Sequence, residues 1–321
     1  MSGKDLRIVF MGTPEFAVAS LKRLVEEGYN IVAVVTTPDK PAGRGQKIHE
    51  SDVKVAAREL GLPILQPEKL KSEEFVEAMR ALQPDLGIVI AFRMLPEVIW
   101  AMPKYGTFNL HASLLPQYRG AAPINWAIIN GETETGITTF LLNHEIDKGA
   151  IVGQRKMPIL EEDNIGTMYD KLMVEGCDLV VETVEKIAAQ DFTPIEQMHI
   201  DESTLNPAPK IFKEDCKIDW NWDGKRIVNF VRGLSPYPAA WTPLYLNGEE
   251  KGSAKIFEVK FVSKSVDGRA GKIISDGKEY IAVCCADGMI EINSMQMAGK
   301  KRMSNRDLLL GFRSIEDYTC M

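Results

Sequence analysis

Leu6-Arg-Ile-Val-Phe10 is an apolar run that leads through Gly12-Thr13-Pro14 into residues 16–25, where apolar side chains recur at helical spacing. The run predicts a buried strand, and the spacing predicts a helix. Thr13 suits the N-cap, Pro14 the first helical position and Gly28 the C-terminal stop. A buried strand that turns directly into a helix is typical of the first unit of an α/β sheet.

The same alternation continues along the chain. Apolar runs predict strands at residues 31–36, 86–91, 106–110 and 136–142. Helical spacing and stop signals predict helices at residues 51–60, 72–82, 123–129 and 165–189. Strands that alternate with helices imply a mostly parallel, Rossmann-like sheet with helices on both faces.

A second domain is predicted after residue 210. Thr193-Pro194, Asn206-Pro207 and Pro209 interrupt regular structure, so residues 190–210 are expected to form a linker between a domain of residues 1–189 and one of residues 211–321. Five short β-rich runs follow, at residues 241–246, 254–262, 271–274, 280–285 and 289–295. Four turn pairs separate or flank these runs: Asn247-Gly248, Asp267-Gly268, Asp276-Gly277 and Asp287-Gly288. This spacing predicts a small five-stranded barrel.

Composition describes an ordinary globular protein, with 321 residues, 45% hydrophobic and 26% charged. The apolar run near the N-terminus is too short for a signal peptide, and no stretch approaches a membrane span, so we expect a cytoplasmic protein. The five cysteines are scattered and lack C-x-x-C spacing, which predicts reduced structural thiols.

The net charge of −7 is unevenly distributed. From Ile211 onward there are 17 Lys+Arg against 15 Asp+Glu, a net +2, whereas the first 210 residues carry 21 against 30. Lys300, Lys301 and Arg302 lie together in the more basic part. They form either a solvated face or a modest phosphate-contacting surface.

Three residues suggest acyl transfer. Asn109 and His111 lie at the carboxyl end of a predicted strand, where open α/β sheets bind ligands, and Asp147 follows a later strand. An amide and an imidazole can stabilise an oxyanion, and a carboxylate can orient the imidazole and accept a proton. The alternative for His111 is a hydrogen-bonded core histidine, and spacing alone does not decide between them.

Other catalytic classes have weaker support. A G-x-G-x-x-G fingerprint is absent after the first strand, which disfavours a dinucleotide site. The four histidines lack H-x-x-x-H pairing, so no metal is expected. No G-x-S-x-G motif supports a serine hydrolase.

A Gly/Pro-rich loop at residues 38–47 carries Lys40, Arg44 and Lys47 and follows a sheet strand at the same end as the predicted site. Two interpretations remain open for it: a solvated loop, or a phosphate-backbone contact beside the active site.

The chain resembles the formyltransferases that use 10-formyltetrahydrofolate. The resemblance rests on Phe10–Phe16, Pro41-Ala-Gly-Arg-Gly45, Asn109–Pro123 with its Ser-Leu-Leu-Pro segment, Gly136-Ile-Thr-Thr, Ile146–Gly149, Ile218-Asp-Trp220, Arg232–Pro236 and Ala298–Lys301. These segments span nearly the whole chain. Their combination with the basic loop and the β-rich tail is similar to the branch that acts on charged tRNA.

The resemblance implies a Rossmann-like catalytic domain and an OB-like C-terminal barrel that binds tRNA. It implies transfer of a formyl group from 10-formyltetrahydrofolate to the α-amine of methionine on initiator tRNA. We further expect a monomer that uses no metal and binds no membrane. By motif position, the catalytic residues are Asn109, His111 and Asp147, and the folate and formyl group lie along Ser113, Leu114, Leu115 and Pro116. The implied tRNA contacts are Lys40, Arg44, Lys47, Lys300, Lys301 and Arg302.

Two segments depart from the family pattern. Ala91-Phe92-Arg93 stands where the family usually has Ala-Tyr-Gly, and Asn143-His-Glu-Ile146 replaces a glycine-bearing turn before Asp147. Two other functions also remain: formyl transfer to a small amine such as an amino sugar nucleotide or a ribosylamine, and RNA binding without catalysis. The second gives no reason for Asn109, His111 and Asp147 to occur together.

Overall fold

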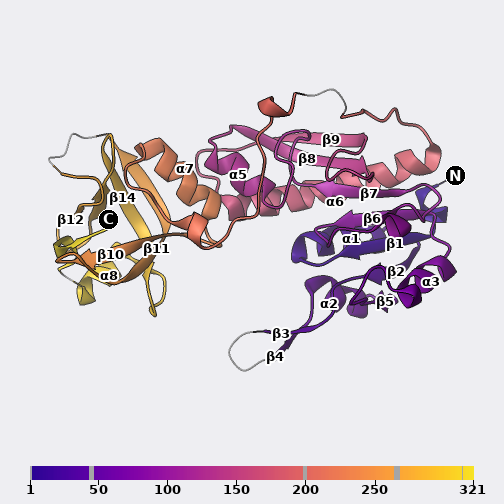
Figure 1. Cartoon of the computed structure of the whole chain (residues 1–321), viewed down its shortest axis with the longest axis horizontal. Coiled ribbons are helices and arrows are strands. Elements are labelled where there is room, and N and C mark those ends of the chain that lie inside the picture. The colour runs from indigo at the N-terminus through magenta and orange to yellow at the C-terminus, as the bar shows by residue number, and fades with distance from the viewer. Residues whose placement is uncertain (1, 43–46, 198–200, 264–267, 313) are drawn as a thin grey trace. The chain divides into compact units, whose positions relative to one another are not determined.

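The computed structural model describes residues 2–42, 47–197, 201–263, 268–312 and 314–321. It divides into two units, each built from several stretches of chain. The first unit comprises residues 1–120, 136–157 and 169–207, and the second comprises residues 121–135, 158–168 and 208–321. The labelled strands and helices and the course of the chain can be followed in Figure 1.

The main sheet has the strand order β5-β2-β1-β6-β7-β8-β9. Its strands are β1 (Ile8–Gly12), β2 (Ile31–Val35), β5 (Ile64–Leu65), β6 (Leu86–Ile90), β7 (Thr107–His111), β8 (Glu134–Leu141) and β9 (Ile151–Pro158). The pairs from β5 to β7 are parallel, and β8 runs antiparallel to β7. Every residue of β1 and β6 is buried, as expected for parallel strands with both faces covered. The Rossmann-like prediction is confirmed.

The helices of the first unit follow the predicted pattern. They are α1 (Glu15–Glu26), α2 (Asp52–Glu59), α3 (Glu73–Ala81), α4 (Glu97–Trp100) and α6 (Ile165–Ala189). The short helix α4 was not predicted, and the first residues of α6 belong to the second unit. One detail was wrong: Pro14 is the N-cap of α1, and its side chain makes no capping hydrogen bond, so Thr13 does not cap this helix. Tyr169 replaces that cap, because its hydroxyl accepts a hydrogen bond from the Phe16 N–H at 2.8 Å.

The arrangement of the parallel strands brings three chain segments to one edge of the sheet. β1, β6 and β7 are neighbours, with Gly12 paired to Ile90 and Ile90 paired to Leu110. Their carboxyl ends therefore lie side by side, and His111 is the last residue of β7. Ligands of open α/β sheets bind at this edge.

A short hairpin projects from the first unit beyond α2 (Figure 1). Its strands, β3 (Lys40–Ala42) and β4 (Lys47–His49), pair antiparallel to each other and belong to neither large sheet. We call residues 40–49 the arm. Arg44 and its neighbours at residues 43–46 lie outside the described residues.

The second unit is built on an antiparallel sheet in the order β12-β13-β14-β11-β10-β16, with β15 paired to β14. The strands are β10 (Ala240–Leu246), β11 (Glu249–Val262), β12 (Ile273–Ser275), β13 (Ile281–Cys284), β14 (Met289–Met297), β15 (Met303–Ser304) and β16 (Tyr318–Thr319). A bridge between Lys272 and Thr319 joins the two ends of the sheet, so it curls into a nearly closed barrel. The five predicted strands are confirmed.

Several elements of the structure were absent from the prediction, namely the short strands β3, β4, β5, β15 and β16, the short helix α4, and three longer or packed elements. β9 is an edge strand of the main sheet, and the helices α7 (Gly224–Leu234) and α8 (Asn305–Gly311) pack on the barrel core. The predicted helix at residues 123–129 is α5 (Pro123–Ile129), and it packs against α7. All five cysteines are free thiols, as predicted. Among the described residues, no helix is long and apolar enough to span a membrane.

Candidate active site

His111 is fixed by its own strand and by the loop that follows. Its side chain is 7% exposed, and Nε2 lies 2.9 Å from the carbonyl oxygen of Tyr118. A carbonyl only accepts, so Nε2 must carry the hydrogen of this bond. The other ring nitrogen, Nδ1, is thereby left to face Asp147. The histidine is thus oriented by the backbone of residue 118.

Asn109 lies two residues earlier on the same face of β7. Its Oδ1 atom is buried and accepts no hydrogen bond from any of the described residues. A buried polar atom without a partner is costly, and active sites are where such atoms are retained. Asn109 is therefore placed to bind a ligand beside His111.

Asp147 approaches the histidine from the segment between β8 and β9. Its Oδ2 is 4.0 Å from His111 Nδ1 and accepts a hydrogen bond from the Gly120 N–H at 3.1 Å. The residue has φ 55°, a left-handed conformation that aspartate tolerates better than most residues. A side chain on Gly149 would lie 1.6 Å from the Leu141 carbonyl oxygen, so only glycine fits two residues after the carboxylate.

The Ser113–Pro116 segment forms a loop pinned to β8. Thr138 Oγ1 donates to the Ser113 carbonyl at 2.7 Å and accepts from the Leu115 N–H at 3.2 Å. The Ser113 hydroxyl is itself completely buried and donates to the Gln117 carbonyl at 2.7 Å. Leu114 and Pro116 are partly exposed, whereas Leu115 belongs to a small core cluster. Ser113 therefore shapes this loop.

Sequence reasoning missed several residues that support these segments. Gln154 on β9 donates to the Leu115 carbonyl and to Thr138 Oγ1, both at 2.9 Å. Arg119 and Gln197 contact the backbone of Asp147. The Gly136-Ile-Thr-Thr motif was the available signal for Thr138, but nothing in the local pattern marks Gln154 or Gln197.

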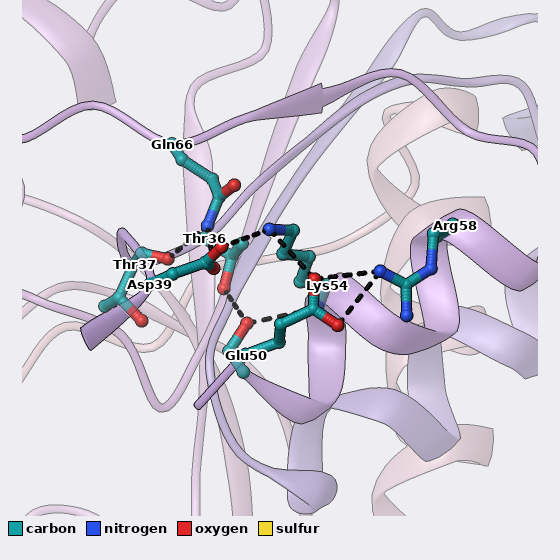
Figure 2. A network of polar contacts seen from close by, with 8 residues as sticks. Thr36, Thr37, Asp39, Glu50, Lys54, Arg58 and Gln66 are labelled. Atoms are coloured by element: carbon teal, nitrogen blue, oxygen red, sulfur yellow. Dashed lines mark hydrogen bonds and ion pairs between the residues drawn. The ribbon is translucent and has the colours of Figure 1, made fainter. Parts of the chain in front are cut away.

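Both ends of the arm are joined by a polar network (Figure 2). Lys54 Nζ on α2 lies 2.5 Å from Asp39 Oδ2 before the arm and 3.0 Å from Glu50 Oε1 after it. Arg58 donates to both oxygens of Glu50, and Gln66 donates to Asp39. The hydrogen bonds from Lys54 are the main cause that lowers the pKa of the Asp39 and Glu50 carboxyl groups.

The residues predicted to contact nucleic acid differ in their exposure and in their partners. Lys40 is exposed, and Lys47 belongs to β4. In the second unit, Lys300 and Lys301 are exposed on the turn after β14. Arg302 is paired instead: it binds Glu258, donates to Ser294 Oγ at 2.7 Å and lies over the Phe257 ring.

Arg93, which departs from the family pattern, turns toward the segment before α3. It donates to the carbonyls of Pro67 and Glu68 at 2.8 and 3.1 Å, and its guanidinium lies over the Phe92 ring. Burial lowers its pKa. This large cation therefore fastens the β5–α3 connection to the end of β6.

Both parts of the chain match known families. Residues 6–184 match the formyl transferase family and residues 210–313 match the formyl transferase C-terminal domain. A methionyl-tRNA formyltransferase of Bacteroides thetaiotaomicron is 56% identical over 319 residues, which cover 99% of both chains. One of Porphyromonas gingivalis is 48% identical over 320 residues, again 99% of both.

Two solved structures share the fold. An N-formyltransferase of Helicobacter canadensis, in complex with folinic acid and dTDP-3-aminofucose, matches 91% of this chain and 99% of its own, with a TM-score of 0.62 and 20% identity. HypX of Aquifex aeolicus, in complex with tetrahydrofolic acid, matches 96% of this chain and 47% of its own, with a TM-score of 0.62 and 21% identity. With the family matches to both of its parts, the chain belongs to the formyl transferase family.

Proposed function

We propose that this enzyme transfers the formyl group of 10-formyltetrahydrofolate to the α-amine of methionine on initiator tRNA. The observation that carries the proposal is the arrangement of Asn109, His111 and Asp147 at the carboxyl edge of the sheet. The acceptor is supported by the name of the relatives that match along 99% of both chains. A cytoplasmic monomer is part of the same proposal.

The reaction forms one C–N bond and breaks another. The uncharged α-amine attacks the formyl carbon, and the tetrahedral intermediate collapses with cleavage of the bond to N10 of the folate. The amine loses one proton, and N10 gains one. The enzyme must therefore stabilise an oxyanion and move a proton, which are the tasks of an oxyanion donor and a general base.

Each residue of the trio has its own part in the reaction. The amide N–H of Asn109 donates to the formyl oxygen, and its unpartnered Oδ1 accepts from the attacking amine. His111 donates from Nε2 to the Tyr118 carbonyl, and its Nδ1 faces Asp147 and the reacting atoms. Asp147 stabilises the protonated ring and helps to remove the proton.

The folate and the tRNA are assigned to different surfaces. The loop of Ser113, Leu114, Leu115 and Pro116 lines the folate and formyl site. Lys40, Arg44 and Lys47 of the arm contact the acceptor end of the tRNA, and Lys300, Lys301 and Arg302 contact its backbone. Because Arg302 is paired with Glu258, we expect Lys300 and Lys301 to contribute more of the salt-dependent affinity.

The test is transfer of labelled formyl from 10-formyltetrahydrofolate to methionine charged on initiator tRNA. Parallel acceptors are uncharged tRNA, a ribosylamine and a dTDP-linked amino sugar. Formyl-methionine on the tRNA, lost in Asn109→Ala, supports the proposal. Transfer only to a small amine contradicts the acceptor but keeps the chemistry, and RNA binding without transfer to any acceptor contradicts both.

A further inference from the structure

The segment that follows α6 runs along the active site. Ile195 and Ile151 exchange two backbone hydrogen bonds, at 2.8 and 2.9 Å, and the Tyr118 N–H donates to the Asn206 carbonyl at 2.8 Å. Tyr118 is the residue whose carbonyl orients His111, and Ile151 begins the strand after Asp147. The described part of residues 195–206 therefore contacts both stretches of chain that carry the site.

The Gln197 side chain contacts the turn that carries Asp147. It is 7% exposed, and its Nε2 donates to the Asp147 carbonyl at 3.1 Å and to the Gly149 carbonyl at 2.7 Å. Its Oε1 accepts from Arg119 Nη2 at 2.8 Å. Arg119 Nε in turn donates to the Asp147 carbonyl at 3.2 Å. The Asp147 carbonyl thus has two side-chain donors.

These contacts bear on the direction of the Asp147 carboxylate. The residue is held at φ 55°, which costs free energy unless the surroundings determine it. With its carbonyl fixed on one side, the side chain points to the Gly120 N–H and His111 on the other. A left-handed aspartate released from these donors would relax, and its carboxylate would leave the imidazole.

We propose that Gln197 is a positioning residue that fixes Asp147 for proton transfer; this rests on the proposed function. Its amide is suited to the task because one nitrogen bridges two carbonyls of the same turn while the oxygen anchors Arg119. It acts on catalysis through Asp147.

The experiment compares full-length Gln197→Leu and Gln197→Glu with the wild-type enzyme. Gln197→Leu removes the donor and the acceptor, whereas Gln197→Glu keeps an acceptor for Arg119 and replaces the donor with a charge facing two carbonyls. We expect kcat to fall at least about tenfold in both, as for a small misplacement of a catalytic group. KM for the formyl donor and for charged tRNA should stay within about twofold.

The matched control is Tyr29→Phe. Tyr29 is equally buried and donates to Glu185 Oε1 at 2.7 Å, and it precedes β2 at the amino edge of the sheet, away from the site. This variant should lower the melting temperature and leave kcat unchanged. A role of Gln197 that is merely structural predicts the same result for Gln197→Leu, and that result overturns the proposal.

A double variant separates this inference from the proposed function. In an Asp147→Asn background, Gln197→Leu should cause less than about a twofold further loss of kcat, because coupled residues are not additive. Full additivity of the two losses overturns the positioning role. Absence of formyl transfer by the wild-type enzyme refutes the proposed function instead. If Gln197→Leu does not fold, Gln197→Glu decides by the same criteria.

Discussion

At the scale of single residues, a substitution of Asn109 is expected to lower catalysis without lowering the stability of the fold. Its Oδ1 has no partner among the described residues, so removing that atom breaks no hydrogen bond of the folded chain. We expect Asn109→Ala to lower kcat by about 10²–10³-fold, the usual effect of losing an oxyanion donor. Its urea midpoint should stay close to that of the wild-type enzyme. Near-normal single-turnover transfer would contradict the assignment.

The grouping of Asn109, His111 and Asp147 could be predicted from sequence, but the contacts that hold this grouping could not. Asn109 and His111 follow a recognisable strand, and Asp147 belongs to a motif, so pattern and resemblance point to them. Gln197 lies in a stretch without apolar periodicity. Its proposed role depends on a hydrogen bond to the backbone carbonyl of Asp147, which is 50 residues earlier in the sequence. Backbone carbonyls leave no mark on sequence, so only the fold identifies such a residue.

Cys320 gives the barrel a predictable sensitivity to alkali. Burial raises the pKa of this thiol from 9.0 to about 12, so between these values the unfolded chain loses the proton first. Its contribution to the free energy of unfolding is complete below about pH 9 and is lost as pH rises toward 12. We expect Cys320→Ala to flatten the decline of that free energy between pH 9 and 11, measured in urea. An unchanged slope would show that other groups cause it.

At the scale of elements, apolar periodicity identified most of the longer strands and helices, and its failures have physical causes. α7 has apolar residues at helical spacing, but Gly224 and Gly233 within it read as breakers. Gly233 is there because a side chain would collide with Ile129 and with the Asn125 carbonyl of α5. β9 was missed because an edge strand alternates with exposed polar residues after its second position.

Lys54 is expected to fix the base of the arm. It joins Asp39 and Glu50, the residues on either side of the arm, so Lys54→Met removes the ion pairs that hold the two ends of the arm together. In the proposed function the arm contacts tRNA, and its looser attachment should weaken that contact. We expect KM for charged tRNA to rise by about tenfold with kcat at saturation little changed. Lys71→Met, an exposed lysine on the same unit, is the control. Equal KM and kcat values for the two variants would show that the ion pairs of Lys54 do not contribute to tRNA binding.

At the scale of the whole molecule, the chain is organised less linearly than a boundary at residues 190–210 suggests. The unit that contains the barrel also contains residues 121–135 and 158–168. Within it, Asn125 donates to the Gly233 carbonyl at 2.8 Å, and the Ile159 N–H donates to the Thr133 carbonyl at 2.9 Å. Contacts between segments so distant in sequence leave no local sequence pattern. Composition therefore indicated only a linker at residues 190–210 and not the exchange of segments between the two units.

Substitution of Arg232 tests whether residues 158–168 stabilise the unit that contains the barrel. Its guanidinium donates to the Asp163 carbonyl at 2.7 Å, to the Leu160 carbonyl and to Asn229 Oδ1, and burial lowers its pKa. Arg232→Met removes the three hydrogen bonds of the guanidinium, two of them to carbonyls of residues 158–168, and we expect a loss of about 1–3 kcal/mol in the free energy of unfolding. Arg232→Lys should recover part of it, because an ammonium reaches fewer acceptors than the planar guanidinium. The measurement is urea unfolding followed by tryptophan fluorescence. If Arg232→Met unfolds at the wild-type urea concentration, residues 158–168 do not stabilise the unit that contains the barrel.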